Sequence, residues 1–449
     1  MSQKQNFLHD PILSSLLRFA GPVFLALCLQ AAYGAVDLLV VGWFGTAADM
    51  SAVSTGSQIL HTITIVVTSF AMGVTVLIAQ RIGEGRGREA GKVIGASICL
   101  FAVIGLLVTL LQVIAAEGLS SLMHAPAEAF AKTAEYVRIC GAGSLFIVAY
   151  NLLGSVFRGM GDSKTPLLAV GIACVANVLG DLLLVGACKM GAAGAAIATV
   201  AAQAISVVLC LWVIRHRGLP FPFDTSMLRW DGPILNRVMS LGSPIALQEL
   251  LVGISFLVIL TIVNSLGLTP SAGVGVAEKL CAFIMLVPSA FSQSLSAFAG
   301  QNMGARKPHR AQKAMALGMG ASFLCGILMA VTVFLFGVEL SHIFTDDPAV
   351  ARASADYLQA YAIDTMFVAF LFCYMGFFNG CGKTRFVMLQ GIVGAFCIRI
   401  PVSYLFSKIE PVSLFRVGLA TPASTLVQIA LCTIYFLHLR KTFPPVDQE

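Results

Sequence analysis

Long runs of mainly apolar residues recur along the whole chain, separated by short segments that carry glycine and charge. The hydrocarbon core of a bilayer is about 30 Å thick, so about 20 apolar helical residues are needed to cross it. Of the 449 residues, 58% are hydrophobic and only 11% are charged, whereas about 25% of the residues in soluble domains are charged. A soluble fold could not bury so much apolar surface, so the pattern predicts an all-α polytopic membrane protein.

Twelve apolar runs are long enough to span a membrane. They are residues 14–41, 51–80, 93–115, 134–159, 165–187, 193–215, 240–265, 271–301, 314–337, 355–380, 385–406 and 418–440. Because twelve is even, both chain ends are expected on the same side of the membrane.

The basic residues are distributed unevenly between the two sides. The side that holds the N-terminus and every second loop carries 20 of the 28 lysines and arginines, and the other side carries 6. Lys279 and Arg399 lie within apolar runs. The positive-inside rule therefore predicts an integral plasma (inner) membrane protein with both termini in the cytoplasm. The net charge of +6 then reflects topology and not a nucleic-acid partner.

Several motifs that could indicate other functions do not fit. The twelve cysteines are scattered without a CxxC pair, which favours buried apolar roles over disulfides or a zinc site. NGCGKT (379–384) ends like a phosphate-binding loop, but Phe377 stands where that loop requires a glycine. The seven histidines show no metal-ligand spacing, and the N-terminal segment lacks the features of a signal peptide. The sequence thus predicts no enzyme activity, no metal and no cofactor.

The two halves of the chain repeat each other. Three blocks match in the same order at offsets of 221 or 222: AQRIGEGRGREAGK (79–92) with GQNMGARKPHRAQK (300–313), VFRGMG (156–161) with FFNGCG (377–382), and GPVFLAL (21–27) with SPIALQE (243–249). Each half holds six spans, so the repeats are parallel. We predict an N-lobe at 1–215, a cytoplasmic linker at 216–239 and a C-lobe at 240–449.

These motifs together resemble those of the multidrug and toxic compound extrusion (MATE) family, most closely its DinF- and NorM-like bacterial branches. The resemblance rests on Pro22 and Asp37 in the first span and on four blocks: AQRIGEG, FRGMGDSKTP, AGQNMGARKPHRA and FFNGCGKT. It implies twelve transmembrane helices in two six-helix lobes, a V-shaped central cavity, and export coupled to entry of protons or sodium.

Polar residues form a stripe on each of two spans of the N-lobe. Gln30, Tyr33 and Asp37 lie at i, i+3 and i+7 on the first span, and Asn177 and Asp181 lie four residues apart on the fifth. If the stripes meet, two carboxyl groups share a poorly solvated site. Burial and a like charge both disfavour ionisation, so this site could take up and release a proton.

The family resemblance agrees with this interpretation, because DinF-like members carry an Asp on the first helix and an Asn/Asp pair on the fifth. The alternative is a hydrogen-bonding network that only holds the helices together. Two acids without a basic partner would do this poorly, so we favour the functional interpretation.

The C-lobe carries a different set of polar residues within its spans: Glu249, Glu278, Lys279, Tyr361, Asp364 and Arg399. Asp364 with Arg399, and a glutamate with Lys279, could form structural ion pairs. NorM-like members place a Glu on the seventh helix and an Asp on the tenth, where sodium is thought to bind, so a coupling or substrate role stays open. Offsets of 221 and 222 take Asp37 to Val258 and Ile259, which suggests that the lobes have specialised.

The sequence therefore predicts a monomeric secondary active exporter that exchanges amphipathic, often cationic organic compounds for inward protons. Its cavity, lined with Met, Phe and small residues, would adapt to many apolar shapes. Its other partners would be membrane lipids. Sodium coupling is the alternative within this class. A flippase of lipid-linked precursors would need a more basic cavity, and a channel is the third possibility.

Overall fold

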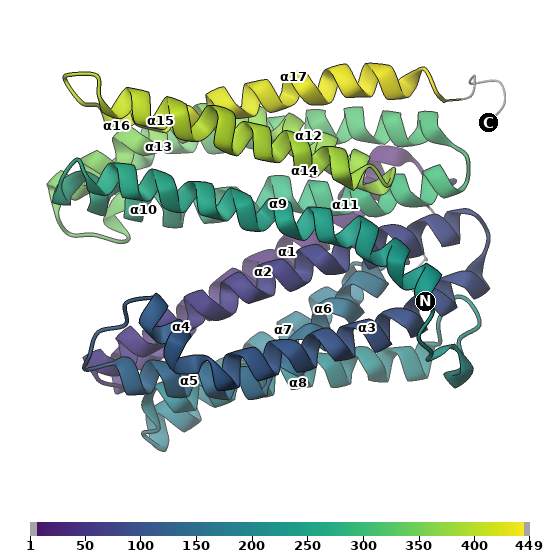
Figure 1. Cartoon of the computed structure of the whole chain (residues 1–449), viewed down its shortest axis with the longest axis horizontal. Coiled ribbons are helices and arrows are strands. Elements are labelled where there is room, and N and C mark those ends of the chain that lie inside the picture. The colour runs from purple at the N-terminus through teal and green to yellow at the C-terminus, as the bar shows by residue number, and fades with distance from the viewer. Residues whose placement is uncertain (1–6, 444–449) are drawn as a thin grey trace. The chain divides into compact units, whose positions relative to one another are not determined.

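The protein is all helical in the computed structural model, which describes residues 7–443, and no strand occurs among these residues. Eleven of the described helical segments are long and apolar enough to cross a membrane. A twelfth span results if Phe130–Ala142 and Ser144–Gly159, which meet at a 50° bend, are taken together. Each of the predicted apolar runs coincides with one of these spans, so the predicted fold class is confirmed (Figure 1).

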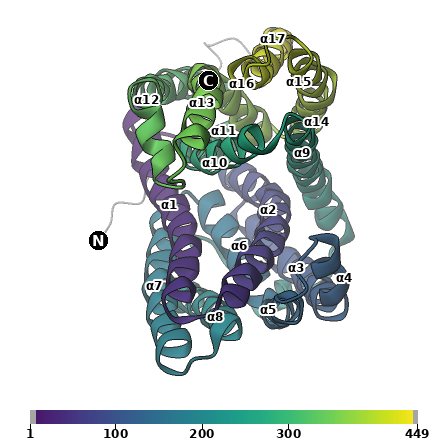
Figure 2. The same ribbon diagram turned by 90° about the vertical axis from the view of Figure 1, so that its left-hand side faces the viewer.

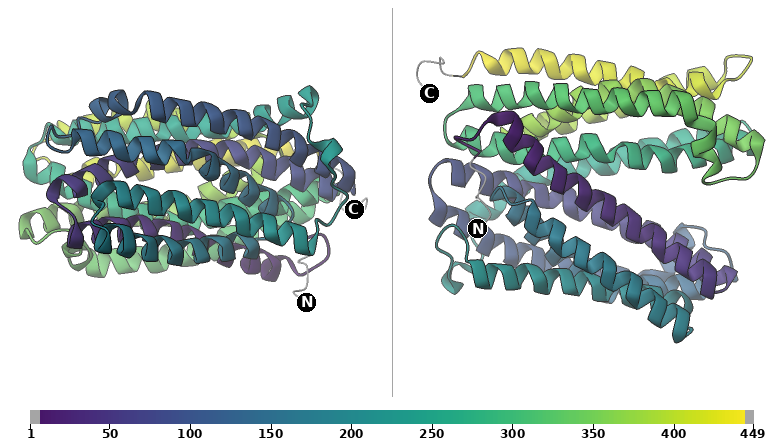
Figure 3. Two further views of the ribbon diagram at one scale, coloured as in Figure 1. Left: turned by 90° about the horizontal axis from the view of Figure 1, so that it is seen from below. Right: turned by 180° about the vertical axis from the view of Figure 1, so that it is seen from behind.

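One compact unit comprises Gly21–Ala246 among the described residues. Its helices are α1 (Ile12–Phe44, from residue 21 onward), α2 (Ala47–Gly83), α3 (Gly87–Ile114), α4 (Ala116–Leu122), α5 (Phe130–Ala142), α6 (Ser144–Gly159), α7 (Lys164–Asp181), the π-helical η1 (Leu182–Ala187), α8 (Gly191–Arg217) and the 3-10 turn η2 (Thr225–Met227). Within this unit, α6 packs against α2, α3 and α8, and α7 packs against α8. The views in Figure 3 show these helices running along one another.

The second unit comprises residues 7–20 and 247–443 of the described chain. Its helices are α9 (Gly232–Asn264, from residue 247 onward), α10 (Leu268–Ile284), α11 (Leu286–Gly304), α12 (Pro308–His342), α13 (Pro348–Gly380), α14 (Thr384–Ile392), the π-helical η3 (Val393–Arg399), α15 (Ile400–Ser407), α16 (Leu414–Gly418) and α17 (Ala420–Arg440). The most buried of them is α13, which packs against α10, α11, α12 and α17 (Figure 2).

Two helices contribute to both units. The first residues of α1 belong to the second unit, and the first residues of α9 belong to the first unit. Each helix carries a proline beside its point of division, Pro22 in α1 and Pro244 in α9. A proline inside a helix removes one backbone hydrogen bond and allows bending. Contacts thus divide the chain within α1 and α9, whereas the sequence places the division at the connection between the repeats.

The connection between the repeats packs on the first unit. Phe221 and Phe223 lie against its apolar core, and a Cβ atom on Gly95 of α3 would lie only 2.0 Å from the carbonyl oxygen of Met227. Glycine at this position therefore allows the connecting segment to lie directly on α3.

Candidate functional site

The two polar stripes predicted for the N-lobe meet inside the first unit. Asp37 of α1 is 4% exposed, and Asn177 and Asp181 of α7 are fully buried. Asp37 lies within side-chain interaction range of both Asn177 and Asp181, and Tyr33 also lies near Asp37. The spacing of these residues along α1 and α7 brings the two carboxyl groups to one buried site.

Besides α1 and α7, helix α8 contributes residues to this site, and these residues were not predicted from the sequence. Thr199 donates a hydrogen bond from Oγ1 to Oδ2 of Asp37 at 3.1 Å. Gln203, one turn further along α8, donates from Nε2 to the Tyr33 hydroxyl at 3.0 Å. The only available signal was their spacing of four residues in an alanine-rich helix, and neither residue carries charge.

Much of the hydrogen-bonding capacity of the site is unused. Oδ1 of Asp37, both side-chain oxygens of Asp181 and both polar atoms of Asn177 are buried without a partner in hydrogen-bond geometry among the described residues. Neither aspartate forms a salt bridge with a lysine or arginine in this part of the chain. Two buried carboxyl groups without a cation cannot both be charged at low cost. They are suited to share a proton and to titrate as one unit.

The backbone at Asp181 is unusual. The α-helical part of this span ends at Asp181, and the π-helical turn η1 follows directly. At Gly180 the helix approaches α8 so closely that a Cβ atom would lie 3.0 Å from Cβ of Ala198. Single π-helical turns are rare and occur frequently at functional sites. The small residues and the irregular turn together bring Asp181 against α8.

One predicted residue of this stripe does not join the acidic pair. Gln30 lies beside Tyr150 of α6, which is itself buried and donates its hydroxyl to the carbonyl oxygen of Pro166. The structure therefore groups Tyr33, but not Gln30, with the two aspartates.

In the second unit, Asp364 of α13 and Arg399 at the end of η3 are 1% and 6% exposed. They interact electrostatically, but no salt bridge joins them among the described residues, so the structure does not show the ion pair that is one of the two possibilities considered from the sequence. Arg399 instead donates from Nη1 to Oγ of Ser255 at 3.2 Å, and its guanidinium carbon lies 4.6 Å from the centroid of the Phe256 ring. Both oxygens of Asp364 and Nε of Arg399 have no partner in hydrogen-bond geometry in this part of the chain.

The other C-lobe candidates do not form the expected pairs either. Lys279 is exposed, with Nζ 5.6 Å from the centroid of the Phe344 ring, and no salt bridge from it to a glutamate occurs among the described residues. Oε1 of Glu278 is buried without a partner there. Tyr361 is buried with its ring 5.4 Å from that of Tyr357. Glu249 of α9 is partly buried.

No group of three histidine, cysteine, aspartate or glutamate side chains that could hold a metal ion occurs in the described ranges. The expected absence of a metal and of other cofactors stays a prediction, because no bound group was tested.

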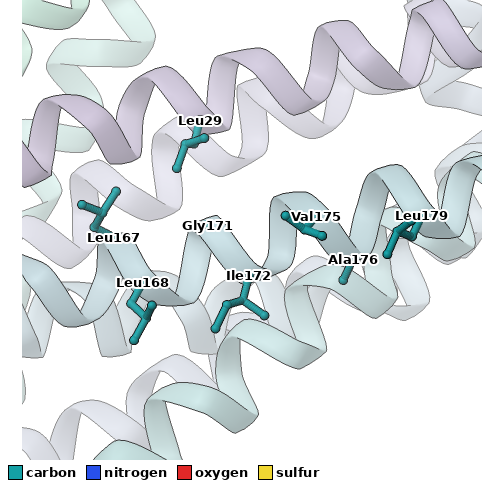
Figure 4. A pocket seen from close by; sticks show the side chains of 8 residues that line it. All are labelled: Leu29, Leu167, Leu168, Gly171, Ile172, Val175, Ala176 and Leu179. Atoms are coloured by element: carbon teal, nitrogen blue, oxygen red, sulfur yellow. The ribbon is translucent and has the colours of Figure 1, made fainter.

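An apolar groove of about 610 Å³ lies between α1 and α7. Figure 4 shows Leu29 of α1 facing the side chains of α7. The lining residues are Leu29, Leu167, Leu168, Gly171, Ile172, Val175, Ala176 and Leu179. The groove contains no methionine or phenylalanine and thus differs from the cavity lining expected from the sequence. Val175 and Leu179 occupy the opposite face of α7 from Asn177.

Known proteins share this sequence pattern and fold. The MatE family model matches residues 22–183 and 244–405. The probable multidrug resistance protein YpnP of Bacillus subtilis is 28% identical over 410 residues, which cover 90% of each chain. The probable multidrug resistance protein NorM of Thermotoga maritima is 22% identical and covers 95% of this chain and 92% of its own. A crystal structure of MATE in complex with MaL6 aligns with a TM-score of 0.91 and 19% identity over 98% of this chain and 100% of that one.

The fold and its two buried polar clusters define an integral membrane protein built from two parallel helical repeats. The two matched segments make up more than half of the sequence, and the chain belongs to the MatE family. Members of this family are transporters and not enzymes, which agrees with the expectation from the sequence.

Proposed function

We propose that the chain is a secondary active exporter that exchanges amphipathic, often cationic organic compounds for protons entering the cell. The observation that carries this proposal is the buried pair Asp37 and Asp181, which has free hydrogen-bonding capacity and no basic partner among the described residues. The names of its relatives YpnP and NorM, both described as probable multidrug resistance proteins, support a broad range of substrates.

The exchange follows from competition for one negative charge. When the pair is deprotonated, it attracts a cationic substrate, and when it takes up a proton from outside, that attraction is lost. An inside-negative membrane potential adds about 2.3 kcal/mol per 100 mV for each charge that enters. The apolar groove beside α1 would hold the apolar part of an amphipathic compound. Alternating access would expose the pair first to one side and then to the other.

Sodium coupling, which would use Glu249 and Asp364 of the C-lobe, is the alternative within this class. A flippase of lipid-linked precursors would require a cavity rich in basic groups, whereas Lys279 and Arg399 are the basic residues that lie well away from the ends of the apolar runs. We further propose that the protein works as a monomer in the inner membrane with both termini in the cytoplasm.

Dye efflux from proteoliposomes tests the coupling. We expect an imposed pH gradient to drive efflux of a cationic dye and an imposed sodium gradient at constant pH to leave the dye inside. The opposite pattern would move the coupling site to the C-lobe. Topology is tested separately by labelling single introduced cysteines from outside intact cells. Residues 46, 189 and 346 should react, and residue 307 should not.

A further inference from the structure

On the exposed face of the membrane-spanning helix α2, a polar segment lies between the exposed side chains of Met50 and Ile65. Ser54, Gln58, His61 and Thr62 are all exposed. Their spacing of four, seven and eight residues places them on one side of the helix. The Thr62 hydroxyl donates a hydrogen bond to the carbonyl oxygen of Gln58. No hydrogen bond to the His61 side chain occurs among the described residues.

The exposed face of the neighbouring helix α3 has the opposite character. Its large exposed side chains include Val103, Leu106, Leu107, Leu110 and Leu111, which are 45–60% exposed. Such a face is typical of a helix that contacts lipid. Both helices belong to the same unit, so the difference between their exposed faces indicates different surroundings.

His61 lies well inside its span. It is 14 residues from the start of α2 at Ala47, which corresponds to about 21 Å along the helix. Trp43, 69% exposed at the adjoining end of α1, is the kind of residue that marks a membrane interface. An ionisable side chain at such a depth is costly against lipid and usually faces a water-filled cavity. The polar face of α2 is therefore expected to meet water or a ligand.

Charged groups on the helices packed against α2 do not account for His61. On α5, Lys132 is paired with Asp49 of α2 at 2.7 Å, and Arg138 is paired with Glu117 of α4. Tyr136 of α5 faces α2 at Gly56, and Glu135 is exposed. The charged residues of α3, α6 and α8 lie in the first two turns or the last turn of each helix. None of these groups acts on His61.

We propose that the face of α2 formed by Ser54, Gln58, His61 and Thr62 lines the aqueous route of the substrate, and that the charge of His61 selects against organic cations. This rests on the proposed export function. A histidine in contact with water gains its charge between about pH 8 and pH 5. The neutral imidazole admits a cation, and the imidazolium repels it. Acidic conditions on the side to which this face opens thus weaken cation binding and favour release.

Binding of two dyes at different pH values tests the role of the charge. Ethidium is a permanent organic cation, and Nile red is uncharged. For the unchanged protein we expect the Kd of ethidium to rise about tenfold from pH 7.5 to pH 5.5, as for a like charge at short range in a partly hydrated site. His61→Gln should reduce this rise and leave the part that protonation of Asp37 and Asp181 causes. His61→Lys should weaken ethidium binding at both pH values and leave Nile red binding unchanged.

His342→Gln, at the end of α12, is the matched control and should behave like the unchanged protein. An ethidium pH profile that is the same for the unchanged protein, His61→Gln and His61→Lys would overturn the proposed role of His61. This outcome differs from failure of the export function, in which the unchanged protein would bind no ethidium at any pH.

The aqueous route is tested independently of any substrate. His61→Cys in otherwise unchanged protein should react with a membrane-impermeant maleimide much faster than Leu107→Cys on the lipid-type face of α3, with modification at each position measured by mass spectrometry. Equal rates at positions 61 and 107 would show that the two faces have the same surroundings and would exclude a water-lined face on α2.

Discussion

The two repeats place different chemistry at the same structural positions. The matched family segments begin at residues 22 and 244, which sets an offset of 244 − 22 = 222. At that offset, the pairs of corresponding residues are Tyr33 and Ser255, Asp37 and Ile259, Asn177 and Arg399, and Asp181 and Ser403. At these four positions the N-lobe thus carries two acids and no base. The C-lobe carries an arginine, Arg399, where the N-lobe has the amide of Asn177.

Both repeats contain a π-helical turn in the span that carries these positions. A π-helical turn follows Asp181 in the first repeat, and another ends at Arg399 in the second. The acid of the C-lobe, Asp364, comes instead from α13, and Arg399 turns toward Ser255. At the offset of 222, residues 182–187 correspond to 404–409, so the two π-helical turns lie at different positions. The repeats thus differ in the position of this turn as well as in their charges. The site with two unpaired acids is the better candidate for proton exchange.

A second difference concerns helix separation. In the N-lobe, a Cβ on Gly171 of α7 would lie 3.8 Å from Leu29 of α1, and the apolar groove lies between these helices. In the C-lobe, a Cβ on Gly391 of α14 would lie 2.9 Å from Cγ of Gln248 of α9. Leu168 of the groove corresponds to the buried Gln390 at the offset of 222. The groove of the N-lobe is therefore replaced by closer packing and buried amides.

The largest expected effect separates the acids of the N-lobe from their C-lobe counterparts. Asp181→Asn should remain folded, because asparagine has nearly the same shape and avoids a buried charge. It should reduce pH-driven efflux to the level of protein-free liposomes, and Asp37→Asn should do the same. The double variant should be no worse than either, as for groups that act as one unit. Ser403→Ala should keep its transport. Equal loss in all these variants would contradict lobe specialisation.

The next effect concerns stability in the C-lobe. Arg399→Met and Asp364→Asn should each destabilise the protein, the first by about 1–3 kcal/mol through loss of a buried charged hydrogen bond. Because the two residues interact electrostatically, the destabilisation of the double variant should be smaller than the sum of the two single effects. Thermal unfolding of the single and double variants in detergent measures this. If the double variant were as stable as the unchanged protein, the result would indicate a direct ion pair between Asp364 and Arg399.

A smaller effect is expected at the bend between α5 and α6. A Cβ at Gly143 would lie 2.3 Å from Cγ1 of Val200 in α8, so Gly143→Ala should destabilise the N-lobe by about 1–3 kcal/mol through overpacking. Val200→Ala should recover part of this loss. The residue 222 positions later is Thr365, inside the unbroken helix α13. Thermal unfolding of Gly143→Ala without any loss would show that the bend does not depend on this close approach.

The smallest effect compares two threonines at corresponding positions. Thr199→Val removes the hydrogen bond to Asp37, worth about 0.5–1.5 kcal/mol, so pH-driven efflux should slow by about 2- to 10-fold. Thr421→Val, 222 positions later, should leave efflux unchanged, because its hydroxyl has no partner among the described residues. Initial rates of dye efflux distinguish the two, and a larger effect of Thr421→Val would reverse the assignment of roles.

The spans could be predicted from the sequence because the bilayer demands long apolar runs. The bend and the π-helical turns within the spans could not be predicted from the sequence. Gly143 is one of 42 glycines, and only the close approach of Val200 distinguishes it. The π-helical turns at Asp181 and Arg399 likewise have no sequence signal that separates them from regular helix.

The site was predictable where charge identified it. Asp37, Asn177 and Asp181 stand out because polar groups are rare within apolar spans. Thr199 and Gln203 were missed because they are uncharged and act only through the packing of α8. Whether Asp364 pairs with Arg399 could not be decided from the sequence, because sequence indicates which residues share a lobe but not the direction of a long side chain.

Proton release on substrate addition tests the central claim most directly. Purified protein in weakly buffered detergent solution should release protons when a cationic dye is added, if the dye displaces protons from Asp37 and Asp181. The account predicts that Asp181→Asn and Asp37→Asn each abolish this release, while Asp364→Asn retains it. Undiminished release from both N-lobe variants, with loss in Asp364→Asn, would contradict the account and place proton exchange in the C-lobe.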